Sequence, residues 1–464
     1  MEVIKTDILP NCHVIAKVDQ PNTLNLKALC IFAATGFFMD DDTYWKNEVC
    51  LRPAHKHQLD EHGILKSSKP WFEWHYSPNE LTFEQTLEAY IALLTQITKE
   101  QLGDNPVILP LSGGLDSRSQ AMVLKDFDNP VHAYSYRFLN GYPEHHIAKK
   151  IADVCGFSFE AFQIPKGYLW HCIDDLAHIN KCYSEFTHPR QMAVLPQLKQ
   201  MKGVFSLGHW GDVLFDKGAP EGSTHVEILP LLLKKMLKPG GLEFANALWK
   251  AWGLDGDFKS YFIGRIEIAL SKINIENVSA KIRAFKTTQW AHRWTTNNLS
   301  VFEAANPITL PYYDNRMSQF ICTVPEAFLA NRRLQIAHLK QDKALSNITW
   351  QAQRPYSINN FDYNKTPYNL PYRVMNKLQR SLQAATGKPY IQRNFELQFL
   401  GVENDKALSM HLFDDMLSDF IPQEVTHTFY NLFKEKDVVY YSHPVSMLLT
   451  FALWQKHFNN KLKH

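Results

Sequence analysis

The sequence predicts an α/β protein whose centre is a parallel β-sheet, with a small β-rich segment before it and a helical part after it. Between residues 107 and 207, short apolar runs alternate with stretches of helical composition. Strands that alternate with helices are typical of a parallel sheet with crossover helices. A Gly-rich loop directly after the first apolar run supports the same fold class, since such loops join strands to helices in ligand-binding α/β proteins.

The elements of this sheet are expected in a regular order. Apolar runs predict strands at 107–111, 131–136, 159–162 and 204–207. Helical composition and spacing predict helices at 82–101, 117–126 and 144–154. In such a sheet, ligands bind at the carboxyl ends of the strands.

Three parts are expected along the 464 residues: 1–80, 81–375 and 376–464. Beta-like runs at 13–16 and 29–32 predict that the first part is a small β-rich domain. Beyond residue 225 the pattern is mostly helical, broken at Pro239-Gly240-Gly241 and again near Pro307. Residues 376–464 are expected to form a helical extension.

Composition narrows the classes of partner. The net charge is +2 and no Lys/Arg-rich run occurs, so a nucleic-acid partner is not expected. Seven widely spaced cysteines without a C-x-x-C pair argue against a disulfide framework or a zinc site and favour a cytoplasmic protein with reduced thiols. The first residues carry acids and lack a signal-peptide core, and no apolar stretch is long enough for a membrane span, so no membrane association is expected.

The most informative stretch is Ser112–Ser117, with the sequence SGGLDS, directly after the run 107–111. Its two glycines allow the backbone to turn sharply and bring N–H groups against phosphate oxygens. The helix expected next would direct its positive end at the same place. We therefore predict a pocket for the pyrophosphate of ATP, with Asp116 holding Mg²⁺. The alternative is a Gly-Gly turn followed by an Asp or Ser helix cap.

A second Gly-rich loop, Gly208–Phe215, follows the run 204–207 and contains Asp212. Asp116 and Asp212 would then reach one magnesium ion from two loops at the same edge of the sheet. Gly211-Asp212 alone is a common turn. Its pairing with the first loop is what favours a two-sided site for ATP and Mg²⁺.

The first loop matches the SGGxDS motif of the PP-loop ATP pyrophosphatases, and Gly208–Phe215 resembles the S-G-x-G-x-D-E-x-F loop of the asparagine synthetases. The similarity covers roughly residues 80–365. It implies a PP-loop synthetase domain that uses ATP and Mg²⁺. In such enzymes a carboxylate attacks the α-phosphate, pyrophosphate leaves, and an amine or ammonia then displaces AMP to form an amide.

The resemblance also implies roles for particular residues. Asp116 and Asp212 would bind the metal, while Leu111 and Tyr136 would flank adenine. The full set of expected nucleotide contacts is Leu111, Ser112, Gly113, Gly114, Asp116, Ser117, Tyr136, Leu207 and Gly208.

Three further residues are candidates for catalysis at positions where the sequence departs from the family. His209 stands where the family has a glutamate or a tyrosine that orients or deprotonates the amine, which an imidazole can also do. It could instead simply pack beside Trp210. Glu303 is a candidate acidic partner for His209. Arg354 is a candidate for the family's late lysine, although a solvated surface arginine is the alternative.

The nitrogen source is a further open point. Glutamine-using relatives carry a nucleophilic cysteine directly after the initiator methionine, whereas this chain has Glu2 there and its first cysteine is Cys12. Residues 1–80 resemble a truncated remnant of the glutaminase domain. Ammonia, an organic amine or a separate glutaminase or pathway partner is therefore expected to supply nitrogen. Asparagine, macrolactam, β-lactam and peptide-cyclising chemistry all stay open, as do another PP-loop activity and a non-catalytic ATP-binding subunit.

Overall fold

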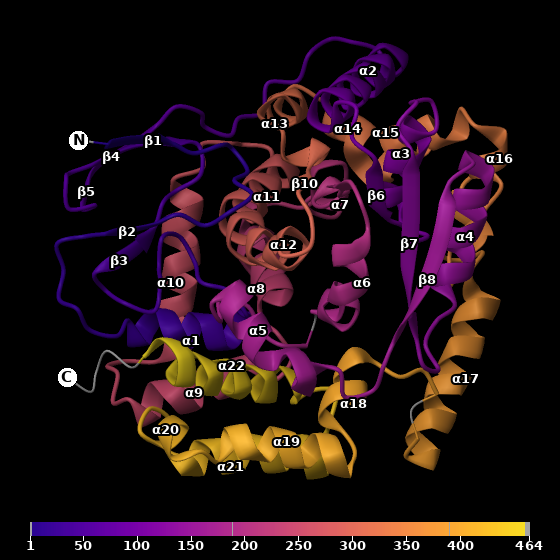
Figure 1. The fold of residues 1–464 in the computed structure, drawn as a ribbon. Coiled ribbons are helices and arrows are strands. Elements are labelled where there is room, and N and C mark those ends of the chain that lie inside the picture. Colours follow the sequence, from indigo (N-terminus) through magenta and orange to yellow (C-terminus); the bar gives the residue numbers. More distant parts are fainter. Residues whose placement is uncertain (1, 188, 389, 460–464) are drawn as a thin grey trace.

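The computed structural model, which describes residues 2–187, 189–388 and 390–459, contains a five-stranded parallel sheet (Figure 1). The strand order is β10-β9-β6-β7-β8. Their bounds are β6 Val107–Pro110, β7 Val131–Phe138, β8 Ser158–Ile164, β9 Val204–Ser206 and β10 Ile308–Thr309. All neighbouring pairs are parallel, which confirms the predicted fold class.

The order of the strands creates a crevice at one position. In the chain, β7 and β8 are added on one side of β6, whereas β9 and β10 are added on the other. Val107 of β6 therefore pairs with Val131 of β7 and with Val204 of β9. The connections that leave β6 and β9 run in opposite directions, and in open α/β sheets ligands bind in the crevice between them. The two Gly-rich loops follow these two strands.

Helices form at the three positions predicted around the sheet: α2 Phe83–Leu102, α3 Leu115–Leu124 and α4 Glu144–Cys155. Thr82 and Gln85 start α2 with reciprocal side-chain-to-backbone hydrogen bonds of 3.2 and 3.0 Å. Helix α4 packs on β7 and β8.

The rest of the chain is mostly helical, as expected from the sequence beyond residue 225. In the middle of the chain the helices are α5 Leu169–Asn180, α6 Leu195–Gln200, α7 Gly211–Leu214, α8 Ile228–Met236, α9 Gly241–Ala251, α10 Phe258–Ser271, α11 Val278–Lys286, α12 Thr296–Glu303, α13 Asn315–Cys322, α14 Glu326–Leu329, α15 Arg333–Lys340 and α16 Lys343–Ser346. A hairpin, β11 Thr349–Gln351 and β12 Arg354–Ser357, precedes α17 Leu370–Thr386, α18 Asn394–Phe399, α19 Val402–Leu412, α20 Asp415–Ser418, α21 Gln423–Asn431 and α22 Ser442–Phe458. No helix in the described ranges combines the length and apolarity that a membrane crossing requires.

The amino-terminal segment contains two small antiparallel sheets, which agrees with the predicted β-rich segment. Their strands are β1 Glu2–Lys5, β2 Ile15–Lys17, β3 Glu48–Cys50, β4 His55–Leu59 and β5 Leu65–Pro70. The strand expected at 29–32 is wrong, because these residues lie in helix α1, Leu26–Thr35. Every residue from Ala28 to Thr35 is buried, so the run has no polar face from which to recognise a helix.

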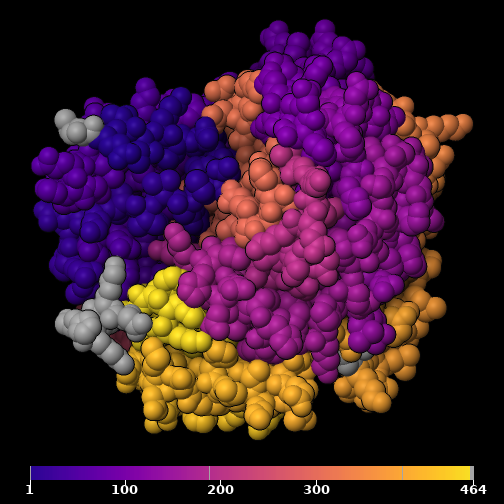
Figure 2. Space-filling model, viewed as in Figure 1, coloured from indigo at the N-terminus to yellow at the C-terminus, as the bar shows by residue number. Residues whose placement is uncertain are grey.

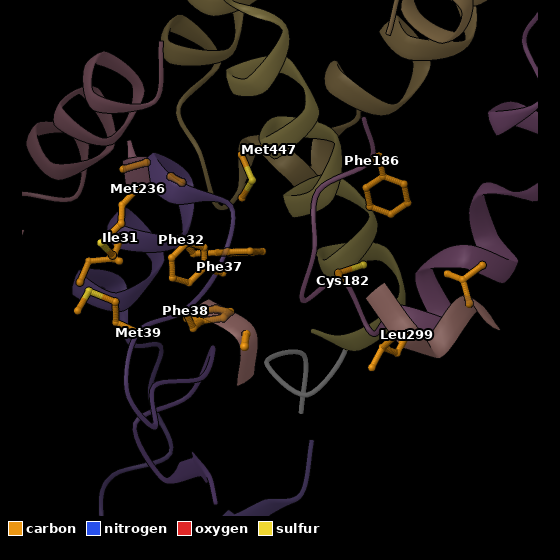
Figure 3. Close-up of a cluster of buried hydrophobic side chains, with 14 of the residues drawn as sticks. Ile31, Phe32, Phe37, Phe38, Met39, Cys182, Phe186, Met236, Leu299 and Met447 are labelled. Carbon is orange, nitrogen blue, oxygen red and sulfur yellow. The ribbon is translucent and has the colours of Figure 1, made fainter. Parts of the chain in front are cut away.

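One hydrophobic core joins the beginning, middle and end of the chain. Phe32 on α1 packs with Phe38 at a ring distance of 4.5 Å and with Phe451 on α22 at 5.9 Å. Figure 3 shows Phe32, Phe37 and Phe38 close to Met447 of α22. In Figure 2 the yellow carboxyl-terminal residues lie beside the indigo amino-terminal part. The domain boundaries at 80 and 375 stay predictions.

Candidate functional site

Two adjoining cavities open at the carboxyl ends of the central strands. The larger, about 710 Å³, lies against β6 and β7 and is lined by Leu111 and Tyr136. The smaller, about 500 Å³, lies between the two Gly-rich loops and the π-helix Thr287–Thr295. Pro110 and Ser112 line both cavities, so the two form one continuous site.

Most of the residues predicted for the site lie around this pair of cavities. Leu111, Ser112 and Tyr136 line the larger one. The smaller one is lined by Ser112, Gly114, Asp116, Ser117, Leu207, Gly208, His209 and Asp212.

The first loop is shaped to accept an anion. The Ser112 hydroxyl lies 3.2 Å from that of Ser117 and accepts a 3.1 Å hydrogen bond from the Gly114 N–H. Gly114 caps α3 and has no side chain that could bind the first N–H groups of the helix. These groups and the helix dipole therefore face the cavity, as in phosphate-binding loops.

The hairpin β11–β12 comes so close to the first loop that only glycine fits at position 113. A Cβ at this position would overlap the carbonyl oxygen of Trp350 and lie 2.9 Å from a carboxylate oxygen of Glu144. Glu144 in turn accepts a 2.8 Å hydrogen bond from the N–H of Ala352. The hairpin therefore packs closely against the first Gly-rich loop.

Arg118 holds the loop and the hairpin together from inside the protein. Its side chain is fully buried, and its Nη2 donates to the carbonyls of Gly113 at 3.2 Å and Thr349 at 2.8 Å. Burial lowers the pKa of Arg118 to about 10, so the guanidinium stays charged at neutral pH. No motif in the sequence marks Arg118, because its partners in the hairpin are carbonyls more than two hundred positions away.

The second loop brings Asp212 to Asp116. Glycines permit the approach: a Cβ on Gly208 would lie 3.0 Å from the Cβ of Asp116, and one on Gly211 would overlap the Asp116 carboxylate. Burial raises the pKa of Asp116 to about 6, Arg332 opposes this rise, and the nearby charge of Asp212 adds to it. Two carboxylates this close repel each other, and a bound cation would relieve that repulsion.

These residues fit a magnesium ion that arrives with a nucleotide. Within the described ranges, no group of three or more His, Cys, Asp or Glu side chains could hold a metal ion by itself. Magnesium is commonly bound by one or two carboxylates, with phosphate oxygens and waters as its other ligands. Asp116 and Asp212 can provide the protein ligands of such a magnesium site.

Two further residues contact Asp116, and neither was found from the sequence. Arg332 Nη2 and Gln335 Nε2 both donate to Oδ1 of Asp116, the latter at 2.9 Å. Arg332 has a left-handed backbone with φ 62°, which directs it inward before α15 begins. No motif marks this bend in the sequence.

His209 lines the smaller cavity beside Asp212. Its ring packs edge-on against Phe302 at 5.6 Å, and among the described residues its Nδ1 has no hydrogen-bond partner. Burial lowers the pKa of His209 to about 4, so the ring is neutral at pH 7. The neighbouring Trp210 has φ 74° and donates from Nε1 to Thr287 at 3.2 Å. A neutral imidazole can accept a hydrogen bond or a proton from a ligand.

Glu303 and Arg354 lie away from both cavities. Glu303 is exposed at the end of α12; burial raises the pKa of the Cys12 thiol, and the nearby charge of Glu303 adds to the rise. Arg354 is exposed at the start of β12, with its guanidinium 5.9 Å from the ring of Trp350. Neither residue lines the cavities, so their catalytic roles stay predictions. Lys286, which the sequence did not indicate, does line the smaller cavity.

Residues 89–205 match the family described as asparagine synthase. The match contains β6, the first loop, β7, β8 and most of β9. It confirms the resemblance of this segment to ATP-using synthetases of the asparagine synthase family, including the loop that faces both cavities.

The other two comparisons give less information about the family. No curated protein matches the chain. One solved structure similar to it is NMN synthetase from Francisella tularensis, with 14% sequence identity and a TM-score of 0.23. That similarity covers 42% of this chain and 97% of the other.

Proposed function

We propose that this chain is an ATP-dependent carbon–nitrogen ligase that activates a carboxylate as an acyl-adenylate and releases AMP and pyrophosphate. One observation carries the proposal. The SGGLDS loop and the loop Gly208–Asp212 leave adjacent strands at the crevice of the sheet and bring Asp116 and Asp212 together. The asparagine synthase match over the first loop supports the same chemistry.

The nucleotide would span both cavities. Adenine fits the larger cavity, against Leu111 and Tyr136. Pyrophosphate fits the first loop, where the Ser112 and Ser117 hydroxyls and the N-terminus of α3 supply donors. Bound between Asp116 and Asp212, Mg²⁺ would neutralise the phosphates and make pyrophosphate a better leaving group.

The reaction has two balanced steps. A carboxylate oxygen forms a bond to the α-phosphorus of ATP, the bond from that phosphorus to the bridging oxygen breaks, and pyrophosphate leaves. A neutral amine or ammonia then attacks the acyl carbon, the acyl–oxygen bond breaks and AMP leaves. The amide nitrogen loses one proton, for which the neutral ring of His209 in the smaller cavity is the proposed acceptor.

The burial of His209 limits how strong a base it is. With a pKa of about 4, the ring accepts a proton less readily than a base whose pKa is near 7. We therefore give His209 the role of orienting the amine through a hydrogen bond and receiving its proton as the carbon–nitrogen bond forms.

A pyrophosphate-release assay tests the proposal. The protein is incubated with ATP and Mg²⁺ and a panel of carboxylates, each with ammonia or an amine. Carboxylate-dependent pyrophosphate and AMP are expected, with a large loss in Asp116→Ala. The exposed Asp128 provides a matched control, and Asp128→Ala should retain the activity. No pyrophosphate with any carboxylate, together with unchanged ATP binding in Asp116→Ala, would contradict the proposal.

A further inference from the structure

The wall of the smaller cavity opposite the phosphate loop is aromatic. Trp210 from the second loop and Trp290 and Trp294 from the π-helix line it. Trp290 and Trp294 are half-buried, so part of each ring faces the cavity. Such a cluster of large rings around a catalytic cavity provides a surface for an apolar ligand.

The backbone of this wall is unusual. Residues Thr287–Thr295 form a nine-residue π-helix between α11 and α12. Pi-helical turns are rare and are frequently found at functional sites. Phe37 stacks on Trp290 at 5.5 Å with an interplanar angle of 19°, which fixes this ring from outside the cavity.

Two lysines lie close to the tryptophan rings. Lys286, the last residue of α11, lines the cavity and has its Nζ 5.9 Å from the centre of the Trp210 ring. Lys238 lies 5.9 and 5.6 Å from the rings of Trp290 and Trp294. A cation beside an aromatic wall suits a molecule with a carboxylate at one end and an apolar body.

Acidic groups for a substrate ammonium are scarce in this cavity. Of the described residues that line it, only Asp116 and Asp212 carry carboxylates, and both are proposed ligands of the magnesium ion. Glu185 lines the neighbouring larger cavity, where it accepts hydrogen bonds from Thr187 and Ser446. An α-ammonium group would lose its hydration here without gaining a counter-charge.

We propose that the carboxylate activated by this site belongs to an aromatic or bulky apolar acid that lacks a free α-ammonium group. This inference rests on the proposed function and specifies its substrate class. The ring or chain of the acid lies against Trp290 and Trp294. Lys286 holds the reacting carboxylate, and His209 borders the space left for the amine. A free amino acid such as aspartate is disfavoured, since its ammonium group would lack a counter-charge and its side chain would not fill the aromatic surface.

The first experiment compares three acids in carboxylate-dependent exchange of pyrophosphate into ATP. 3-Phenylpropionate and L-phenylalanine differ only in the ammonium group, and L-aspartate represents a polar amino acid. We expect kcat/KM for 3-phenylpropionate to be at least 100-fold above that for either amino acid. Equal or faster exchange with L-phenylalanine or L-aspartate would overturn this inference and leave the ligase function standing. No exchange with any of the three, and no pyrophosphate release with the wider panel, would overturn both.

The second experiment tests whether the tryptophan side chains contribute to binding of the acid. Trp294→Leu should raise KM for 3-phenylpropionate at least tenfold and leave KM for ATP within about twofold. Trp74→Leu is the matched control, because Trp74 is half-buried and outside both cavities, and its kinetics should be unchanged.

Binding measured without turnover distinguishes an effect of the tryptophans on substrate binding from an effect on the reaction itself. Calorimetric titration of 3-phenylpropionate in the presence of α,β-methylene-ATP and Mg²⁺ should show binding to the unaltered protein and to Trp74→Leu, and at least tenfold weaker binding to Trp294→Leu. Equal affinity in Trp294→Leu, or no binding to the unaltered protein, would overturn the inference.

Discussion

The two ends of the candidate site differ in how they are built. The phosphate end consists of two short loops whose residues are nearly contiguous, Ser112–Ser117 and Gly208–Asp212. The aromatic end is assembled from Trp210, the π-helix and Lys286, with Lys238 behind it. Loop glycines and a helix N-terminus constrain the first to one geometry. The π-helix and the lysines of the second are positioned by tertiary packing, and only Trp210 comes from one of the two loops.

The largest effect is expected at the phosphate end. Asp116→Asn removes one of the two carboxylates and should lower the rate of pyrophosphate exchange by about 10³-fold, the scale of a lost electrostatic contact to a transition state. Removing Mg²⁺ with EDTA should abolish exchange in the unaltered protein. Exchange rates measured at saturating ATP check both. An Asn variant with near-normal exchange would mean that Asp116 does not serve the metal.

His209 should affect only the second step. His209→Ala is expected to keep pyrophosphate exchange and to lower amide formation by about 10²-fold, the lower end of the usual contribution of a general base. Exchange and amide product are measured in parallel on the same protein. Equal losses in the two assays would remove His209 from the amine step.

Gly113 tests how tightly the hairpin constrains the loop. In Gly113→Ala the new Cβ overlaps the Trp350 carbonyl, so the loop must shift, and a displacement of about 1 Å costs about 10²-fold in rate. Gly264 in α10 has open space around it and serves as the control. Gly264→Ala should leave exchange unchanged and stabilise the protein by about 0.5–1 kcal/mol in a denaturant titration. Normal exchange in Gly113→Ala would show that the loop is not confined.

Arg332 is expected to have the smallest of these effects, because it positions Asp116 and Gln335 contacts the same carboxylate oxygen. Arg332→Gln should lower kcat for exchange by about tenfold, the loss of roughly one charge-assisted hydrogen bond. Arg332→Lys keeps the charge and should lose less. Identical losses in the two variants would indicate a purely structural role.

The positions of the two Gly-rich loops could be predicted from the sequence because their determinants are local, while the roles of their residues stay predictions. A strand, two glycines and a helix start appear as consecutive residues, and the strand order then brings the second loop alongside. Arg118, Arg332 and Lys286 were missed, since their roles depend on residues that only folding brings close. The run 29–32 was misassigned because a fully buried helix has no periodicity of apolar and polar residues.

In the proposed reaction, a carboxylate attacks the α-phosphorus of ATP. Labelling the carboxylate with ¹⁸O tests this directly, because formation of the adenylate followed by amide formation transfers one carboxylate oxygen to AMP. We expect AMP with one ¹⁸O atom for each amide formed, measured by mass spectrometry. Amide formed together with unlabelled AMP, or ATP cleaved to ADP and phosphate, would contradict the account.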